Sequence, residues 1–383
     1  MENKITAESI YIHIPFCKTK CPYCDFASWA KKEHLIDKYF DALLFEIRTK
    51  CESYQNFAHR CKSRLAPTIE TIFIGGGTPS LIPPAYYEKL FDELKKYFTF
   101  DRDCEITMEL NPGTARDDYL EGYKKLGVNR ISIGVQNFNE KILETLGRKH
   151  SVTDTVEAIE KVKKAGITNF NLDFIYAVPG ITKGIWRDSI YRALGFEPKH
   201  ISAYSLIIEP NTPFEQIYKN QKLLPSDDFA YDLYFELCSI LKENNFVHYE
   251  ISNFAKPGYE SKHNINYWLA KEFFAFGSGA HRYLNKLRTS NIRDLKAYIS
   301  CPNLENIIDF QADKKFEKVM LNSRANTGFE LALIKELTTK SHKDITKLLN
   351  DLSNEGYLEL LNNKIYLTDK GLFVNNEILL KLI

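Results

Sequence analysis

Short apolar runs alternate with longer amphipathic segments along the first half of this 383-residue chain. The apolar runs predict strands at Ser9–Ile14, Thr71–Ile74, Glu105–Leu110, Arg130–Val135, Asn169–Ile175 and His200–Leu206. The amphipathic segments predict helices near His34–Lys50, Pro84–Tyr97, Ala115–Lys125, Val152–Lys164 and Ile185–Leu194. This alternation is typical of a parallel sheet covered by helices. Six strands are too few for a closed eight-stranded barrel, so we expect an α/β fold built on a partial, open (β/α)6 barrel.

The alternation stops after Pro210. A strong amphipathic pattern predicts a helix over Ser226–Asn244, and an irregular, aromatic-rich α+β stretch follows it. The chain ends in a pattern of helix, strand, a tight turn at Asn362 and Asn363, and strand, which resembles a small winged helix. We therefore expect three domains, at residues 1–210, 211–305 and 306–383.

Three cysteines stand close together directly after the first expected strand. Cys17, Cys21 and Cys24 lie in the sequence CKTKCPYC, and no fourth cysteine is near them. A cubane iron–sulfur cluster is normally held by four thiolates, so three would leave one iron open to another ligand. The alternative is a structural zinc site completed by His13 or by a distant histidine. Structural zinc sites more often pair two CxxC knuckles, and the chain has no second knuckle, so the cysteines favour a [4Fe–4S] cluster.

The overall composition excludes some classes of protein. Lys and Arg number 51 and Asp and Glu number 50, so net charge gives no support for a nucleic-acid partner, and a packing or lid role suits the winged-helix-like end better. The N-terminal residues lack a signal segment, and no apolar run reaches the ~18 residues of a membrane span. We expect a cytoplasmic protein, because a reducing compartment suits an oxygen-sensitive cluster.

Polar or glycine residues follow several of the expected strands. Strand two ends in the run Gly75–Pro79, and strands three, four and five end with or carry Glu109, Gln136 and Asp173. Ligands bind at the carboxyl ends of the strands in parallel sheets of this kind. Each residue alone has a structural explanation, such as a turn or a solvated edge. Together, after a three-cysteine loop, they indicate a ligand site.

The motifs carry a specific resemblance. The chain resembles the radical S-adenosylmethionine (SAM) family, in the group that contains oxygen-independent coproporphyrinogen III dehydrogenase and the related haem chaperones. The resemblance rests on YIHIPFCKTKCPYC, GGGTPS, ELNPGT, RISIGVQ, LGRKH, LDFIYAVPG and ISAYSLIIEP, and it continues through HNINYW, GAH and RTSNIRD. These motifs cover most of residues 10–210 and extend to about residue 295.

The resemblance implies a radical SAM barrel and a set of cofactor residues. It implies that the [4Fe–4S] cluster is held by Cys17, Cys21 and Cys24. It implies that SAM is bound by Tyr11, Tyr23, Gly76, Gly77, Thr78, Glu109, Gln136, Arg148 and Asp173. Arg148 would otherwise read as a surface cation at a helix end.

Two departures favour the chaperone branch over the dehydrogenase. Cys24 is followed by Asp25 and Phe26, where the dehydrogenase has Gly-Cys, and little chain precedes Cys17, so the dehydrogenase's N-terminal arm is missing. HNINYW also matches the chaperone branch, which implies that His263 is a haem ligand. A neutral imidazole is a common axial ligand of haem iron. A hydrogen-bonded core histidine is the alternative, and His281 is a second candidate.

Three functional hypotheses follow. The first is a haem chaperone that binds a [4Fe–4S] cluster, SAM and haem and passes haem to an acceptor protein. The second is an oxygen-independent coproporphyrinogen III dehydrogenase, which needs an electron donor to cleave SAM. The third is a zinc-stapled binding module. Peripheral membrane contact is expected only if the haem acceptor is a respiratory protein.

Overall fold

The computed structural model of the chain describes residues 7–60, 67–309 and 314–383. Its main sheet has nine strands in the order β11-β1-β4-β5-β6-β7-β8-β10-β9. Six of them correspond to the strands expected from the sequence: β1 (Ser9–Ile14), β4 (Thr68–Gly76), β5 (Thr99–Leu110), β6 (Arg130–Gln136), β7 (Asn169–Tyr176) and β8 (His200–Ser205). The pairs from β1 to β7 are parallel. In the described residues the order ends at β11 and β9 without closing, which confirms an α/β fold with a partial, open barrel.

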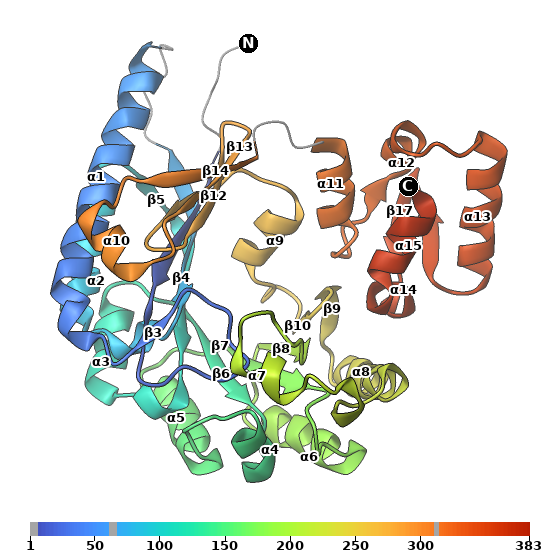
Figure 1. Ribbon diagram of the computed structural model, residues 1–383, viewed down its shortest axis with the longest axis horizontal. Helices are drawn as coiled ribbons and strands as arrows, with labels where there is room; N and C mark the ends of the chain where they lie inside the picture. Colours follow the sequence, from blue (N-terminus) through green and yellow to red (C-terminus); the bar gives the residue numbers. More distant parts are fainter. Residues whose placement is uncertain (1–6, 61–66, 310–313) are drawn as a thin grey trace. The chain divides into compact units, whose positions relative to one another are not determined.

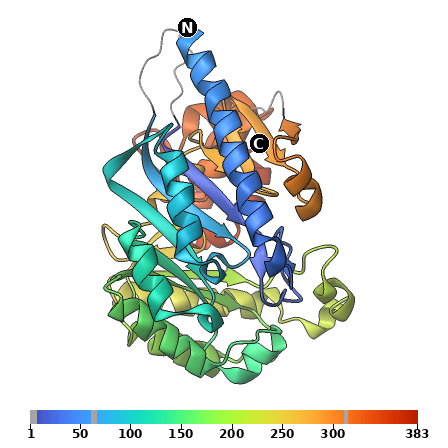
Figure 2. The ribbon, with the colours of Figure 1, turned by 90° about the vertical axis from the view of Figure 1, so that its left-hand side faces the viewer.

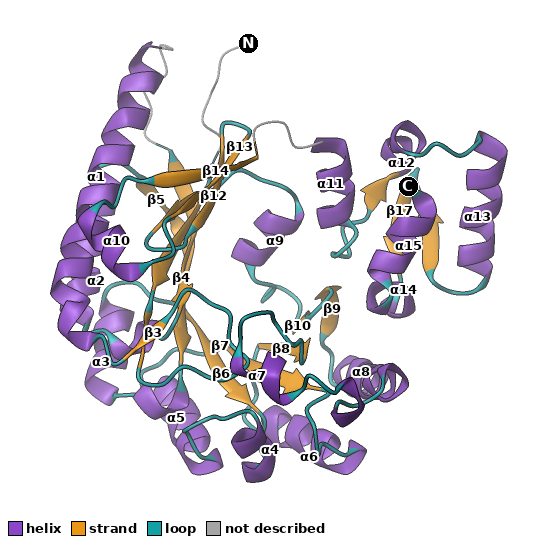
Figure 3. Ribbon diagram, viewed as in Figure 1, coloured by secondary structure: helices purple, strands orange, loops and turns teal. Residues whose placement is uncertain are grey.

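Helices cover the outer side of this sheet, as Figure 1 and, by secondary structure, Figure 3 show. They are α1 (Ile36–Arg60), α2 (Pro84–Leu94), α3 (Asp117–Lys125), α4 (Glu140–Thr145), α5 (Val152–Lys164) and α6 (Lys183–Leu194). Figure 2 shows α1 and α2 side by side, where Phe40 meets the ring of Tyr86 at a centroid distance of 4.8 Å. A capping box of Ser151 and Asp154 fixes the start of α5.

The burial of a strand explains how accurately its bounds were predicted from the sequence. The β1 and β6 strands are almost wholly buried, as is usual where helices cover a parallel sheet, and their apolar runs were predicted to within a residue. The β5 strand begins at Thr99, earlier than expected. The apolar pattern did not reveal its first half because that half is largely exposed and polar. The expectation for β5 was therefore correct only for its buried part.

The stretch that looked irregular in sequence contributes three more strands to the sheet. They are β9 (Val247–Glu250), β10 (Asn253–Ala255) and β11 (Phe274–Phe276). The β11 strand pairs in parallel with β1, and β10 pairs antiparallel with β8 and β9. Strands of three or four residues are too short to show a periodicity. Their pairing depends on contacts with residues far away in the sequence.

Smaller elements complete this part of the chain. A second, antiparallel sheet consists of β12 (His281–Leu284), β13 (Leu287–Asn291) and β14 (Glu305–Asp309). The remaining elements are β2 (Phe16–Cys17), β3 (Trp29–Ala30), α7 (Pro213–Ile217), α10 (Leu295–Ser300) and short 3₁₀ turns at Glu33–Leu35, Pro79–Leu81, Pro112–Thr114 and Gln221–Leu223.

A buried polar network joins α1 to the chain around β11 and β13. The carboxylate of Glu46 accepts hydrogen bonds from Gly277 N (2.9 Å), Tyr298 Oη (2.5 Å) and Asn291 Nδ2 (2.6 Å). The Lys50 ammonium pairs with Glu46 at 2.7 Å and also with Glu305, so its positive charge is shared by two carboxylates. A buried carboxylate is tolerated only with such partners, so the network fixes β11 at the edge of β1.

Contacts within the chain define two compact units. The first comprises residues 1–199, 203–226 and 272–310, and the second comprises residues 200–202, 227–271 and 311–383. These units cut across the expected segments 1–210, 211–305 and 306–383, so the three-domain division stays a prediction.

The second unit holds the remaining helices and a three-stranded antiparallel sheet. Besides β9 and β10 it contains α8 (Asp227–Glu243), α9 (Lys262–Trp268), α11 (Lys314–Asn322), β15 (Phe329–Glu330), α12 (Leu331–Leu337), α13 (His342–Asn354), β16 (Leu358–Leu361), β17 (Lys364–Leu367), α14 (Asp369–Phe373) and α15 (Asn375–Leu382). Asn362 and Asn363 join β16 to β17 with positive φ angles of 50° and 62°, which confirms the expected tight turn. Among all described helices, none combines the length and apolarity needed to cross a bilayer.

Candidate functional site

The three cysteines lie in a short loop at the carboxyl end of β1. Cys17 ends β2, which pairs in parallel with β3, and the Cys24 N–H donates to the Cys21 carbonyl at 3.1 Å. All three are free thiols, Cys17 being buried and the other two partly buried. The pairing of β2 with β3 closes the loop at its base, so the sulfur atoms are held in one small region.

The electrostatics of the loop link the three cysteines to one another. Burial raises the pKa of the Cys17 and Cys24 thiols, and the charge of the neighbouring cysteines raises it further. Three thiols in one small region can hold an iron–sulfur cluster or a single zinc ion, because thiolates ligate both.

His13 is engaged elsewhere and does not act as a fourth ligand in this arrangement. Its Nε2 lies 2.8 Å from the Ala27 carbonyl, which can only accept, so Nε2 carries the proton. Its Nδ1 then accepts from the Tyr11 hydroxyl at 2.9 Å. Burial lowers the pKa of His13 to about 4, which keeps the ring neutral. Both ring nitrogens of His13 therefore have hydrogen-bond partners. Neither is available as the fourth ligand that the zinc alternative took from His13.

Gly76 places backbone where a side chain would not fit. Its φ angle is +117°, and a Cβ atom there would lie 2.6 Å from the His13 ring. Its N–H donates to Glu109 Oε2 at 3.0 Å. Only glycine satisfies both conditions, so the end of β4 passes close to β1 and fixes the Glu109 carboxylate.

The next two residues contact the cysteine loop directly. A Cβ atom on Gly77 would lie 3.0 Å from Cys17 Sγ and 2.7 Å from the Phe16 carbonyl oxygen. The Thr78 hydroxyl lies 3.5 Å from Cys17 Sγ, within hydrogen-bonding distance of the sulfur. The glycine run predicted from the sequence is therefore packed against the first cysteine.

Two carboxylates, Glu109 and Asp173, lie on β5 and β7, the strands on either side of β6. Burial, and secondarily the charge of Asp173, raise the pKa of Glu109 to about 7. Asp173 accepts from Ser132 Oγ at 2.9 Å and from Asn171 Nδ2 at 2.7 Å. Two like charges in a buried site are costly. A ligand that brings a positive charge or hydroxyl donors would relieve this repulsion.

Gln136 ends β6 in an unusual backbone conformation. Its φ angle is +64°, and the pairing of β6 with β7 shifts register between Ile133 and Gln136. Such left-handed conformations are uncommon for residues other than glycine and often mark functional sites. The side chain folds back over β6, since a Cβ atom on Gly134 would lie 3.0 Å from Gln136 Nε2.

Arg148 connects β6 to the cysteine loop. Its Nη1 lies 3.4 Å from Cys21 Sγ and 3.5 Å from the Tyr23 hydroxyl, and its Nη2 donates to the Gly134 carbonyl at 3.2 Å. The guanidinium thus places a fixed positive charge next to the cysteines. The sequence pattern alone did not suggest this role for Arg148, whereas the family resemblance did.

Three further residues support the site and were not predicted. Ser132 and Asn171 hold Asp173, and His150 contacts Arg148 Nε through its Nδ1 at 3.3 Å. A signal for Asn171 was present in the sequence, since it precedes Asp173 by two residues and therefore lies on the same face of β7. His150 stands in the LGRKH motif beside Arg148.

His263 belongs to the second unit and lies in α9. It is buried, with 1% of its surface exposed, and its Nε2 lies 2.8 Å from the Tyr267 hydroxyl one helical turn later. The two rings meet edge to face, with centroids 4.9 Å apart. The residue predicted as a haem ligand thus has a side-chain partner within its own helix. The other predicted site residues, from Tyr11 to Asp173, all belong to the first unit.

Comparisons with known proteins agree with this arrangement. The sequence profile of the radical SAM superfamily matches residues 11–190. The haem chaperone HemW of Lactococcus lactis subsp. lactis (strain IL1403) is 34% identical, over 97% of this chain and 96% of the relative. HemW of Escherichia coli (strain K12) is 35% identical, over 97% of each chain. HemW of Bacillus subtilis (strain 168) is 34% identical, over 97% of this chain and 98% of the relative.

A solved structure supports the fold. Coproporphyrinogen III oxidase (HemN) from Escherichia coli, described as a radical SAM enzyme, superimposes with a TM-score of 0.79, covering 98% of this chain and 90% of that one. The two sequences are 22% identical, so this likeness concerns the fold alone. From the full-length sequence relationship, the chain belongs to the radical SAM superfamily and, within it, to the HemW family.

Proposed function

We propose that the chain is a haem chaperone that holds a [4Fe–4S] cluster, SAM and haem, and passes the haem to an acceptor protein. The observation that carries the proposal is the convergence of one cysteine loop and four strand ends in a single unit, in a chain related to HemW over its whole length. We place the protein in the cytoplasm, without a nucleic-acid partner. An electron donor belongs to the proposal only if SAM is cleaved, and peripheral contact with a membrane only if the haem acceptor is a respiratory protein.

The residues fit a three-thiolate cluster. Cys17, Cys21 and Cys24 offer three free sulfurs from one short loop, and both ring nitrogens of His13 are engaged elsewhere. A bound cluster would supply an iron with an open position, where the amine and carboxylate of SAM can coordinate. Arg148 would counter the negative charge of the thiolates from its position 3.4 Å from Cys21 Sγ.

The surrounding residues fit SAM. The backbone at Gly76 and Gly77 leaves room for its methionyl part, and Thr78 lies beside it. Tyr11 precedes the cysteine loop and contacts His13, and Tyr23 lies within the loop and contacts Arg148. The carboxylates of Glu109 and Asp173 would accept from hydroxyl donors, and their mutual repulsion would fall near a sulfonium cation. Gln136 would contribute a neutral donor or acceptor.

For haem we propose that His263 would hold the iron, and that Tyr267 and Trp268 would pack against the porphyrin. Support comes from the relationship to HemW and from the chemistry of imidazole. Because Nε2 of His263 is bound to the Tyr267 hydroxyl, haem binding through this atom has to break that hydrogen bond. Haem affinity would therefore include the free energy of releasing His263.

The test is a haem titration of the anaerobically reconstituted full-length protein, followed by transfer to a haem-free acceptor. We expect saturable haem binding that His263→Ala weakens by at least about 10-fold, the cost of losing an axial bond. His342→Ala is the control, an exposed histidine at the start of α13 in the same unit, and should leave haem affinity unchanged. Equal affinity in wild type and His263→Ala would remove the ligand assignment.

The same preparation separates the chaperone from the dehydrogenase. With SAM, a reductant and coproporphyrinogen III, we expect no decarboxylated product. Formation of protoporphyrinogen IX, or rescue of a strain that lacks the dehydrogenase, would replace the chaperone proposal with the enzymatic one.

A further inference from the structure

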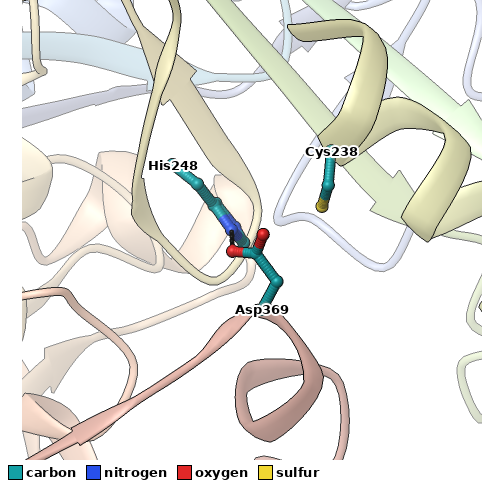
Figure 4. A group of neighbouring side chains, drawn as sticks. All are labelled: Cys238, His248 and Asp369. Carbon is teal, nitrogen blue, oxygen red and sulfur yellow. Dashed lines mark hydrogen bonds and ion pairs between the residues drawn. The ribbon is translucent and has the colours of Figure 1, made fainter. Parts of the chain in front are cut away.

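Three side chains from distant parts of the second unit meet at one point, away from every residue used above. Cys238 comes from α8, His248 from β9, and Asp369 is the first residue of α14. Figure 4 shows the three side chains directed toward one another. Their ligand atoms, one from each residue, all lie within 4.8 Å of one another. A thiol, an imidazole and a carboxylate in such proximity form a set of metal-ligand types.

One ring nitrogen of His248 has a hydrogen-bond partner among the described residues, and the other has none. Its Nδ1 lies 2.7 Å from Asp369 Oδ1, and its ring stacks on Phe254 at a centroid distance of 4.1 Å. Only 9% of its side chain is exposed, and its buried Nε2 has no hydrogen-bond partner among the described residues. Nδ1 is the nitrogen that faces the carboxylate, so a cation that entered between them would replace the proton of this hydrogen bond and take both atoms as ligands.

Cys238 and Asp369 complement the imidazole. Cys238 is 6% exposed, and burial, together with the charge of Asp369, raises the pKa of its thiol. The side chain of Asp369 is 44% exposed, so the cluster has a route to solvent. A cation entering by this route would displace the thiol proton and gain a thiolate, a nitrogen and an oxygen ligand.

We propose that Cys238, His248 and Asp369 bind a divalent cation of the zinc class, with water in the fourth position. The donor types are those zinc prefers, and a mixed sulfur, nitrogen and oxygen set excludes the hard cations Mg²⁺ and Ca²⁺. Because the ligands come from α8, β9 and α14, the ion connects the first helix of the second unit to its C-terminal segment. The site stabilises that unit when the metal binds.

The proposal is independent of the cluster and haem sites, and the experiment keeps them apart. The background is the full-length chain with Cys17, Cys21 and Cys24 all changed to Ala, which removes the other thiolate group. Titration with Co²⁺ should give one equivalent of tetrahedral d–d absorption with a thiolate-to-cobalt charge-transfer band. Zn²⁺ should displace the cobalt and raise the thermal unfolding midpoint.

Cys238→Ala in this background should abolish the charge-transfer band and weaken Zn²⁺ binding by about 100-fold or more. Asp369→Asn, a change at a partly exposed side chain, should weaken it about 10- to 100-fold and keeps the test valid if Cys238→Ala unfolds. Cys104→Ala, at another buried free cysteine, is the matched control and should bind as the background does. A background protein without the band, or one whose band survives Cys238→Ala, would overturn the proposal.

Discussion

The cysteine loop and the histidine of α9 differ in whether their candidate ligand residues already have hydrogen-bond or charge partners within the protein. Around the cysteine loop, Glu109 and Asp173 repel one another, and Arg148 lies beside a thiol rather than a carboxylate. In α9, His263 already has a partner in Tyr267 and is buried.

The first region is arranged for a ligand before the ligand arrives, because its side chains are fixed by backbone and by each other. The second region has to break an internal hydrogen bond before it can bind through the same nitrogen. We therefore expect tight, preorganised binding at the cysteine loop and a more easily reversed binding at His263, which suits cargo that has to be released.

The largest expected effect tests the cysteine loop. Cys17→Ala removes one of three thiolates and should reduce the iron content after anaerobic reconstitution from about four atoms per chain to nearly none. Iron and sulfide analysis with visible absorption measures this. Cys104→Ala should load normally. If Cys17→Ala kept a full cluster, the loop would not be the cluster site.

A second prediction concerns the close approach of β4 to the loop. In Gly77→Ala the new Cβ would lie 2.7 Å from the Phe16 carbonyl oxygen and 3.0 Å from Cys17 Sγ. We expect a loss of about 1–3 kcal/mol in unfolding free energy and at least about 10-fold weaker SAM binding.

Thermal unfolding and SAM titration of the reconstituted protein measure both effects. Gly113→Ala is the matched control, since the nearest atom to its Cβ would be 3.8 Å away. If Gly113→Ala lost as much unfolding free energy and SAM affinity as Gly77→Ala, the close contact between Gly77 and Cys17 would not be the cause of the effect.

A third prediction tests, through pH, the raised pKa of Glu109, which comes first from burial and second from the charge of Asp173. The folded protein raises the pKa of Glu109 from 4.5 to about 7, so it favours the protonated carboxyl. The stabilisation from this group is fully present below about pH 4.5 and is lost as the pH rises through about 7.

Without SAM, the unfolding free energy of the wild type should therefore fall between pH 5 and pH 8 relative to Glu109→Gln, by on the order of 2 kcal/mol. Glu250, whose pKa is also raised by burial, is present in both proteins and cancels in the difference. Parallel pH profiles of the two proteins would contradict the assigned cause.

A fourth prediction sharpens the contrast at α9. Tyr267→Phe removes the hydroxyl that occupies Nε2 of His263 while keeping the aromatic ring. Since a hydrogen bond is worth about 0.5–1.5 kcal/mol net, haem affinity should rise about 2- to 10-fold. Haem titration measures it, and the dissociation rate should fall as well. A lower affinity would mean that Tyr267 assists haem binding instead of competing with it.

The smallest expected effect concerns Asp25, the residue after the third cysteine. Its carboxylate pairs with Arg293 at 2.8 Å, and its backbone carbonyl accepts from the same guanidinium. Both side chains are about half exposed, so the pair contributes at most about 1 kcal/mol. Asp25→Asn should change the unfolding midpoint little and leave cluster loading intact. Failure to load a cluster would give Asp25 a direct role.

The sequence predicted the part of the fold in which buried strands alternate regularly with amphipathic helices. The buried parts of β5, β6 and β7 were visible as short apolar runs, and these runs placed Glu109, Gln136 and Asp173 on the strands where the structure has them. The strands β9, β10 and β11 were missed because each has three or four residues and pairs with a distant partner.

Side-chain partnerships were harder to predict than positions. Nothing in the sequence showed that His13 is held by Tyr11 and Ala27, or that His263 is held by Tyr267, because these contacts depend on rotamers and local geometry. The convergence of Cys238, His248 and Asp369 was equally hidden, since 121 residues separate the last two in the chain.

The central claim is that three thiolates of the cysteine loop hold a cluster and leave one iron for SAM. Electron paramagnetic resonance of the reduced, reconstituted protein, recorded with and without SAM, tests it most directly. The account predicts a [4Fe–4S]⁺ signal that changes on addition of SAM. An iron-free protein, or a signal that SAM leaves unchanged because a protein side chain already ligates the fourth iron, would contradict it.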